Sequence, residues 1–287
     1  MREFVFVVFC MSLIQPVFSQ ISGTYPDQLS SYFYNSSLIN PAYIHRDGSS
    51  EAIVQSKVRS GIYKDIYTIT ATIQKVFQAE NNKWHSARII LQNEKEGPYI
   101  STPRVYANYS IRIGLNENTE LLGGVSIGLV NPNYRIPTKS VSTTLVDGAL
   151  GMTLRRKNIT LGISSNQVFD NSADKSRAIK LNRYYNTFFE ITLIRHAGVE
   201  VKTHLLWTYF SDIPSQYNSS FSILWAGWFE AGLGYKYRQG AIFYSAIILD
   251  KTSRHPIRFG MLYNSTVGLI QANALSEAVE FTLIYSY

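Results

Sequence analysis

The stretch that decides the fold is residues 105–115, which read VYANYSIRIGL. Apolar side chains occupy every second position, and the positions between them include Asn108, Ser110 and Arg112. Successive side chains of a β-strand point to opposite faces of the sheet, so the pattern predicts a strand with one apolar and one polar face. The stretch also has the nine to eleven residues that a tilted strand needs to cross a bilayer.

The same alternation recurs along the chain, and turn-forming Asn, Gly and Pro residues separate the alternating segments. No segment has the periodicity of a long amphipathic helix. We therefore predict about fourteen strands, which start near Ile53, Tyr67, Trp84, Val105, Leu121, Leu145, Ile159, Tyr185, Val199, Ser219, Phe229, Ala241, Arg258 and Val279.

Two architectures contain many alternating strands: a soluble sandwich or propeller, and an outer-membrane barrel. Sandwich strands are usually shorter, near five or six residues. Aromatic residues such as Trp207 and Tyr209 cluster toward strand ends, which is typical of the aromatic girdles of membrane barrels. The chain ends an alternating segment on Tyr287, and such endings resemble the signal for barrel assembly. We predict an all-β fold: one transmembrane antiparallel barrel of about 14 strands, within a range of 12–16, and a short N-terminal plug-like segment.

The N-terminus reads as a secretory signal over residues 1–19. Arg2 precedes an apolar run, and Ser19 supplies a small residue for cleavage. The single cysteine, Cys10, lies inside this signal, so a disulfide scaffold is excluded. The net charge of +7 comes from scattered Lys and Arg without a basic run, so we expect no nucleic-acid partner. The predicted location is the bacterial outer membrane, with outer-membrane lipid as a partner.

We assign residues 52–287 to the barrel, whose polar faces carry many charges. A barrel lumen accepts such side chains because it is polar, whereas the lipid face does not. The charged residues that we expect to face the lumen are Lys57, Arg59, Arg112, Asp147, Glu190, Glu200, Lys202, Glu230, Lys236 and Arg238.

Residues 20–51 lack strand alternation, are rich in Tyr and contain few charges. We expect this segment to pack in the lumen or against the periplasmic rim. Asn35 and Asn40 would cap turns or bond luminal groups, and Pro41 would fix the bend before Tyr43. Partner binding is an open alternative role for these four residues.

Longer polar stretches near 131–142, 169–183, 211–218 and 250–257 predict the rim that binds a protein partner. Tyr134, Phe169 and Tyr217 lie in these stretches, and Tyr184 directly follows one of them. Aromatic side chains exposed at a rim are typical anchors of protein contacts. Alternatively, they complete the outer aromatic girdle.

No catalytic or metal-binding pattern is present. The five histidines are dispersed and show no ligand spacing. His204 shares a strand face with Glu200, which we interpret as lumen lining rather than as part of a hydrolase site. We therefore expect no enzyme activity, no catalytic residue, no metal and no cofactor.

Residues 31–43 read SYFYNSSLINPAY, and this block resembles the N-terminal signature of the PorP/SprF family of the type IX secretion and gliding system of Bacteroidota. Further similarity follows in order at NEKEGPY (93–99), DGALG (147–151), FGMLY (259–263) and EFTLIYSY (280–287). The resemblance implies an outer-membrane protein whose partners are secreted adhesins with a type IX C-terminal signal domain. Periplasmic, peptidoglycan-linked components of the secretion machinery are the other partners that it implies.

The first functional hypothesis is therefore a non-enzymatic barrel that anchors or helps to secrete a surface protein, or links the machinery to periplasmic components. The alternative is a pore or transporter for small or hydrophobic solutes. An outer-membrane hydrolase is a third, less favoured hypothesis. Only residues 20–51 precede the first predicted strand, which is short for the plug domain of a large transporter.

Overall fold

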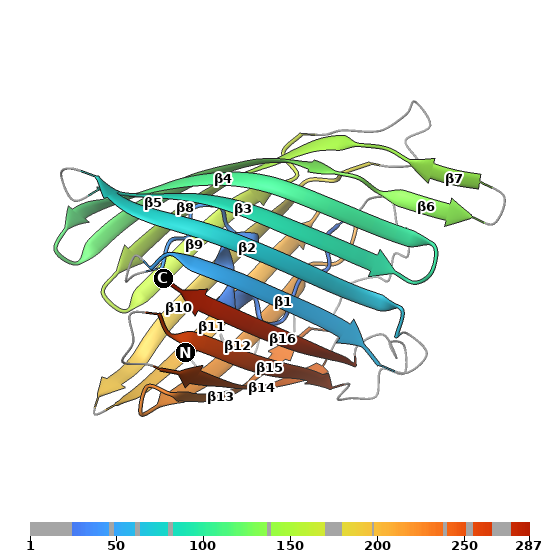
Figure 1. Ribbon diagram of the computed structural model, residues 1–287. Helices are drawn as coiled ribbons and strands as arrows, with labels where there is room; N and C mark the ends of the chain where they lie inside the picture. The colour runs from blue at the N-terminus through green and yellow to red at the C-terminus, as the bar shows by residue number, and fades with distance from the viewer. Residues whose placement is uncertain are drawn as a thin grey trace, which may run out of the picture.

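The alternating segments form one closed antiparallel barrel in the computed structural model (Figure 1). The structure describes residues 25–45, 49–60, 64–79, 83–136, 139–169, 180–196, 198–237, 240–250, 255–265 and 277–287. Within these residues, the fourteen strands of the wall are β1 (Glu51–Arg59), β2 (Ile66–Ala79), β3 (Lys83–Glu96), β4 (Ile100–Asn116), β5 (Thr119–Val130), β8 (Leu145–Arg156), β9 (Ile159–Asn166), β10 (Tyr184–His196), β11 (Val199–Phe210), β12 (Gln216–Trp225), β13 (Phe229–Lys236), β14 (Gly240–Leu249), β15 (Ile257–Ser265) and β16 (Ala278–Ser286).

The barrel closes where the first strand meets the last. β1 pairs with β16 over its whole length, from Glu51 opposite Ser286 to Arg59 opposite Ala278. The backbone N–H of Tyr287 extends this seam by donating to the carbonyl of Ser50 at 2.8 Å. The closed wall has no open strand edge. An open edge would expose unpaired backbone N–H and C=O groups, with which lipid cannot form hydrogen bonds. The predicted all-β barrel of about fourteen strands is thereby confirmed.

One predicted loop is partly a hairpin. Within the stretch 131–142, β6 (Asn133–Ile136) pairs with β7 (Lys139–Ser142), and β6 also pairs with the start of β4. β4 accordingly begins at Ile100, five residues before the start that the alternation predicts at Val105. The polar composition of this stretch favoured a loop, but a hairpin that projects beyond the bilayer needs no apolar face.

The two faces of the wall follow the alternation. Apolar side chains point outward, and Ile73 on β2 is 60% exposed. Its neighbour Thr72 points inward and is 1% exposed. Inward side chains are this well buried because the lumen holds part of the chain itself.

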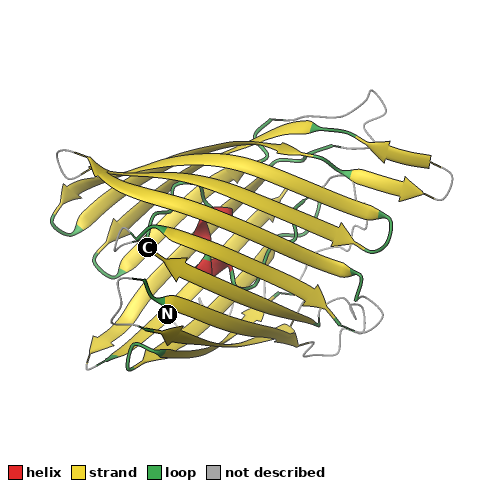
Figure 2. Cartoon of the chain, in the orientation of Figure 1, coloured by secondary structure: helices red, strands yellow, loops and turns green. Residues whose placement is uncertain are grey.

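Inside the barrel lie two short 3-10 helices, η1 (Tyr32–Tyr34) and η2 (Ser36–Leu38), drawn in red in Figure 2. They belong to the chain before β1, which Figure 1 shows in blue within the ring of strands. In the part of the chain that the structure describes, no helix is long and apolar enough to cross a membrane.

The strand order defines two rims. The short-turn rim carries Ser50 and Tyr287 together with the connections 80–82, 117–118, 157–158, 197–198, 226–228 and 250–256. The long-loop rim carries the connections 60–65, 97–99, 131–144, 167–183, 211–215, 237–239 and 266–277.

The expectation that stretch 250–257 shares a rim with the other long stretches is wrong. Each antiparallel strand carries the chain to the opposite rim. Two strands, β13 and β14, separate residues 226–228 from residues 250–256, so both connections lie at the short-turn rim.

Candidate functional site

Residues 25–45 form the luminal segment, which fills the middle of the barrel. Its aromatic block is buried: Tyr32, Phe33 and Tyr34 form one cluster with side chains from several strands. Phe33 lies 4.9 Å from Tyr244 between ring centroids and stacks on His204 at 5.1 Å. Burial of aromatic rings is a large hydrophobic contribution, so this cluster holds the segment against the wall.

The Asn40-Pro41-Ala42 turn docks on two glycines of the wall. Gly124 on β5 and Gly151 on β8 are register partners. A Cβ atom at Gly124 would lie 2.4 Å from the carbonyl oxygen of Pro41, and one at Gly151 would lie 2.0 Å from Oδ1 of Asn40. Only glycine therefore leaves room for the turn, which is the usual reason for glycine within a strand.

Asn40 makes the turn specific through its side chain. Its Nδ2 donates to the carbonyls of Met152 on β8 (3.1 Å) and Ile163 on β9 (3.0 Å). Its Oδ1 accepts from the backbone N–H of Ala42 at 2.8 Å. A buried amide must have its groups satisfied, and only Asn has both the donor and the acceptor at this reach.

Arginines of the wall bind the backbone carbonyls that follow this turn. Arg88 on β3 donates to the carbonyl of Pro41 at 3.1 Å and also to that of Tyr43. Arg155 on β8 donates to the carbonyl of Ile44 at 2.8 Å. Hydrogen bonds from a charged donor are the stronger kind, so these contacts fix the end of the segment nearest β1.

A carboxylate elsewhere on the wall also receives the segment. Glu280 on β16 accepts from the backbone N–H groups of Ser30 and Ser31, both at 2.9 Å, and from Oγ of Ser31 at 2.7 Å. Asn35 donates to Oγ1 of Thr72 on β2 at 3.0 Å. The segment is thus bonded around the circumference of the lumen rather than to one wall.

Asp27 is the charged end of the luminal segment. Its carboxylate lies 2.9 Å from Nζ of Lys57 and 3.6 Å from Nη2 of Arg59, both on β1. Lys236 on β13 donates to the adjacent carbonyl of Gln28 at 2.8 Å. Burial by itself raises the pKa of Asp27, but Lys57, Lys236 and Arg59 outweigh it and lower the pKa to about 2.

The structure places the side chains expected in the lumen as follows. Lys57, Arg112, Asp147, Glu230 and Lys236 are buried. Arg59 contacts Asp27, and Arg238 lies outside the described residues. Charged partners are present for Glu200 (Arg195 at 2.5 Å) and Lys202 (Glu200 at 3.2 Å), and Nδ1 of His204 lies 3.5 Å from the Glu190 carboxylate.

The four residues expected in a plug or partner site, Asn35, Asn40, Pro41 and Tyr43, are all buried in the luminal segment. The rim aromatics divide. Tyr184 is buried, with its ring centroid 6.0 Å from that of Tyr25, so the expectation of an exposed anchor is wrong there. The start of the luminal segment, at Tyr25, covers Tyr184, and the alternating pattern gives no sign of that contact.

The other three rim aromatics are more open. Tyr217 lies parallel to Trp207 on the outer face at 6.2 Å, an arrangement that favours the girdle alternative. Phe169 is 44% exposed and its ring lies over Gly148. Tyr134, on the β6–β7 hairpin, packs partly against the cluster of Val130, Leu145 and Leu181.

Several luminal residues are absent from the sequence prediction: Arg88, Glu94, Arg104 and Glu280. Glu94 and Arg104 form an ion pair buried between β3 and β4. Glu280 precedes Phe281 in an alternating segment, so the same period of two would have found it. The glycine pair at Gly124 and Gly151 has no such signal, because the sequence does not say which glycines meet a luminal backbone.

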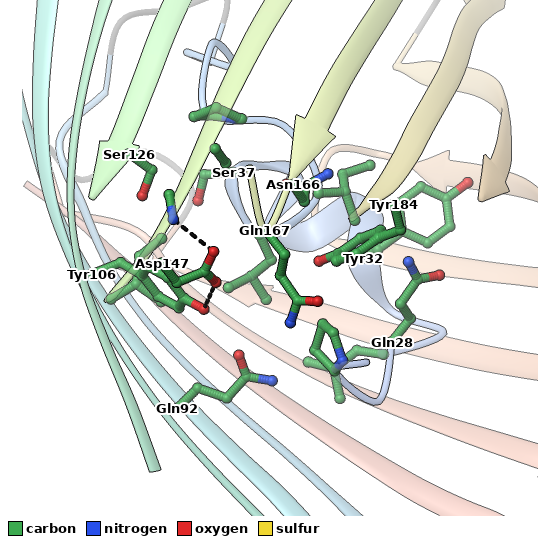
Figure 3. Close-up of a pocket in the computed structure, with 18 of the residues that line it drawn as sticks. Gln28, Tyr32, Ser37, Gln92, Tyr106, Ser126, Asp147, Asn166, Gln167 and Tyr184 are labelled. Atoms are coloured by element: carbon green, nitrogen blue, oxygen red, sulfur yellow. Dashed lines mark hydrogen bonds between the residues drawn. The ribbon is translucent and has the colours of Figure 1, made fainter. Parts of the chain in front are cut away.

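Two cavities flank the luminal segment. The smaller, of about 80 Å³, lies toward the long-loop rim (Figure 3). There Asp147 accepts from the Tyr106 hydroxyl at 2.7 Å and from the backbone N–H of Gly148 at 2.6 Å, as the dashed lines show. Tyr184 and Gln167 also line it.

The larger cavity, of about 530 Å³, lies toward the short-turn rim. Its walls are charged with both signs, through Glu190, Glu230, Arg155 and Arg258 among others. Tyr34 of the segment donates to Glu230 at 3.2 Å, so aromatic side chains of the segment form part of its lining. Across the described residues, no three His, Cys, Asp or Glu side chains gather as metal ligands do.

Comparison with solved structures shows the same fold. The toluene transporter TodX of Pseudomonas putida has a TM-score of 0.56 at 10% identity, over 88% of this chain and 93% of that chain. A TodX monoaromatic hydrocarbon channel with the deltaS2 mutation has a TM-score of 0.59 at 9% identity, over 88% and 94%. The CymD monoaromatic hydrocarbon channel has a TM-score of 0.55 at 10% identity, over 88% and 91%. At such identity the likeness concerns the fold alone.

No curated protein matches the chain. The model of the family described as type IX secretion system membrane protein PorP/SprF matches residues 21–285. That range includes the luminal segment, thirteen strands of the wall and all of β16 except its last residue, Ser286. The chain therefore belongs to the PorP/SprF family of type IX secretion system membrane proteins.

Proposed function

We propose that this protein is a closed, non-enzymatic barrel that anchors a secreted adhesin-like protein at the cell surface or assists its secretion. The partner in this proposal carries a type IX C-terminal signal domain. A link to periplasmic, peptidoglycan-bound components of the machinery is the second role that the family suggests. The proposal includes cleavage of the signal peptide after Ser19.

The observation that carries the proposal is the seated luminal segment. Residues 25–45 occupy the lumen and bond to strands on opposite sides of it, through Arg88, Arg155 and Glu280. A channel needs a passage that is open or easily opened. A lumen bonded to its own chain through buried charged groups is better suited to a rigid platform, whose rims meet other proteins.

The alternative is a channel for small hydrophobic solutes, and the likeness in fold to hydrocarbon channels favours it. The sizes and linings of the two cavities do not favour such a channel. An apolar cavity that takes benzene measures about 150 Å³, and the cavity beside Asp147 has about 80 Å³. The larger cavity has room, but its charged lining would have to be desolvated by an apolar solute, which is costly.

A secretion assay in the source bacterium separates the two functions. We expect deletion of the gene to move the partner from the cell surface to the medium or the periplasm, and the intact gene to restore it. Toluene uptake serves as the second readout and should stay unchanged. Normal surface display together with reduced toluene uptake would contradict the anchor and support the channel.

A double variant tests the rim that binds the partner. If the long-loop rim binds it, Tyr134→Ala with Tyr217→Ala should release the partner while barrel abundance stays normal. Leu249→Ala, an outward-facing residue at the opposite rim, is the matched control. Full retention in the double variant would move the binding surface to the short-turn rim or to the luminal segment.

A further inference from the structure

The luminal segment begins at the long-loop rim. Tyr25 lies 4.6 Å from Phe210 between ring centroids, and its hydroxyl lies 3.4 Å from Oγ of Ser211. Phe210 is the last residue of β11, and Ser211 begins a connection at this rim. The ring of Tyr184, the first residue of β10, lies 6.0 Å from the Tyr25 ring between centroids.

Two residues farther along, Asp27 still lies near this rim. Its partners Lys57 and Arg59 are at the end of β1 that meets the long-loop rim. Its backbone N–H donates to Glu94, two residues before the end of β3 at the same rim. These contacts come from two separate strands, β1 and β3, so they fix the depth of Asp27 independently.

The far end of the segment lies at the opposite rim. Arg112 and Arg155 donate to the carbonyls of His45 and Ile44, and both arginines are close to the strand ends at the short-turn rim. His45 lies 3.2 Å from Glu51, the residue that begins β1 at that rim. The segment therefore descends from one rim to the other before the first strand starts.

We propose that the chain threads its own barrel, so that the N-terminus of the mature protein is presented at the cell surface while the C-terminus lies at the periplasmic rim. Transmembrane barrels have short periplasmic turns and longer outer loops, which puts the long-loop rim outside. Residues 20–24 read QISGT and carry no charge that would oppose their passage. The inference does not depend on which partner the protein binds.

Threading sets an order on assembly. Tyr25 reaches the outer rim only when the apolar signal of residues 1–19 no longer holds the N-terminus at the inner membrane. In the folded barrel the paired β1–β16 seam encloses the segment. Release of the signal therefore precedes seating of the segment, and a chain with an uncleaved signal should fail to seat it.

Cysteine labelling tests the topology directly, because the chain without its signal has no cysteine. Ser22→Cys should react with a bulky, membrane-impermeant maleimide in intact cells, and so should the control Arg135→Cys on the exposed hairpin. Glu117→Cys, in an exposed turn at the short-turn rim, should react only after the outer membrane is opened. Labelling of Ser22→Cys only after opening would overturn the proposal.

A second variant keeps the test decisive if the barrel itself shields the thiol of the Ser22→Cys variant. A Gly/Ser linker that contains one cysteine, inserted between Ser22 and Gly23, lengthens the exit beyond the rim. The cysteine in this linker should react in intact cells to the same extent as Arg135→Cys. If neither variant reacts in intact cells while Arg135→Cys does, the N-terminus is not at the surface.

Discussion

The outer and luminal faces of the same strands obey different requirements. Outward residues such as Ile73 and Ile127 are apolar and exposed, and they meet lipid that discriminates little between one apolar side chain and another. Inward residues such as Glu280 and Arg88 each bond a particular atom of the luminal segment. The outer face therefore specifies only that the chain forms a membrane barrel. The luminal face specifies which segment of the chain fills the lumen of this barrel.

The largest effect should come from placing a charge on the outer face. We expect Ile73→Arg to destabilise the barrel by about 2–4 kcal/mol, the cost of a cation facing the bilayer midplane. Urea unfolding from lipid vesicles, followed by heat-modifiable migration on a gel, measures it. The matched control is Thr72→Val on the same strand, which loses one hydrogen bond worth about 1 kcal/mol. Equal losses would mean that the faces are assigned wrongly.

Next in size is a side chain on the luminal face where the turn docks. Gly124→Val puts a Cβ atom 2.4 Å from the Pro41 carbonyl, and overpacking of this kind costs about 1–3 kcal/mol or more. We expect the Asn40-Pro41-Ala42 turn to leave its seat while the barrel still assembles. Increased proteolysis of the segment and new conductance would report this.

Gly123 offers the control for that experiment, because it is adjacent but faces outward. The nearest atom to a Cβ there is Cγ2 of Ile111 at 4.0 Å. Gly123→Val should leave the segment protected. If the two valine variants behave alike, the close approach of the Asn40-Pro41-Ala42 turn is not the reason why position 124 requires glycine.

The sequence predicted the outer face better than the luminal one, for a physical reason. Alternation marks which residues share a face, so fourteen strands and their approximate starts follow from it. It says nothing about which strand atoms meet the luminal segment, because those contacts join residues far apart in the chain, such as Ser30 and Glu280. The block at 31–43 identified the segment by family resemblance, but the Gly124–Gly151 seat needed the structure.

The ion pairs of Asp27 with Lys57 and Arg59, near the long-loop rim, should stabilise the seated luminal segment by about 2 kcal/mol. The pKa of Asp27 is lowered from 3.8 to about 2, so its contribution to seating the segment is complete above pH 4 and is lost as the pH falls toward 2. Conductance recorded at pH 7 and at pH 2–3 tests the sign. Asp27→Asn should lose this contribution at pH 7 and show a weaker acid response than the wild type. An unchanged acid response in Asp27→Asn would assign the effect to other carboxylates.

The smallest effect should come from the outer girdle at the long-loop rim. Tyr217→Ala removes the stacked contact with Trp207, which is worth about 0.5–1.5 kcal/mol beyond burial. We expect a small loss of barrel stability and no change in protection of the luminal segment. A variant that exposes the segment instead would show that the two faces are coupled at this rim.

The central claim is that residues 25–45 close the lumen. Single-channel recording in planar lipid bilayers tests it most directly, on the mature chain and on the same chain without residues 24–43. Both proteins should show heat-modifiable migration, which establishes that the barrel has formed. We predict a silent mature protein and a stable, open conductance after deletion. A steady conductance in the mature protein, or silence in the deleted one, would contradict the account.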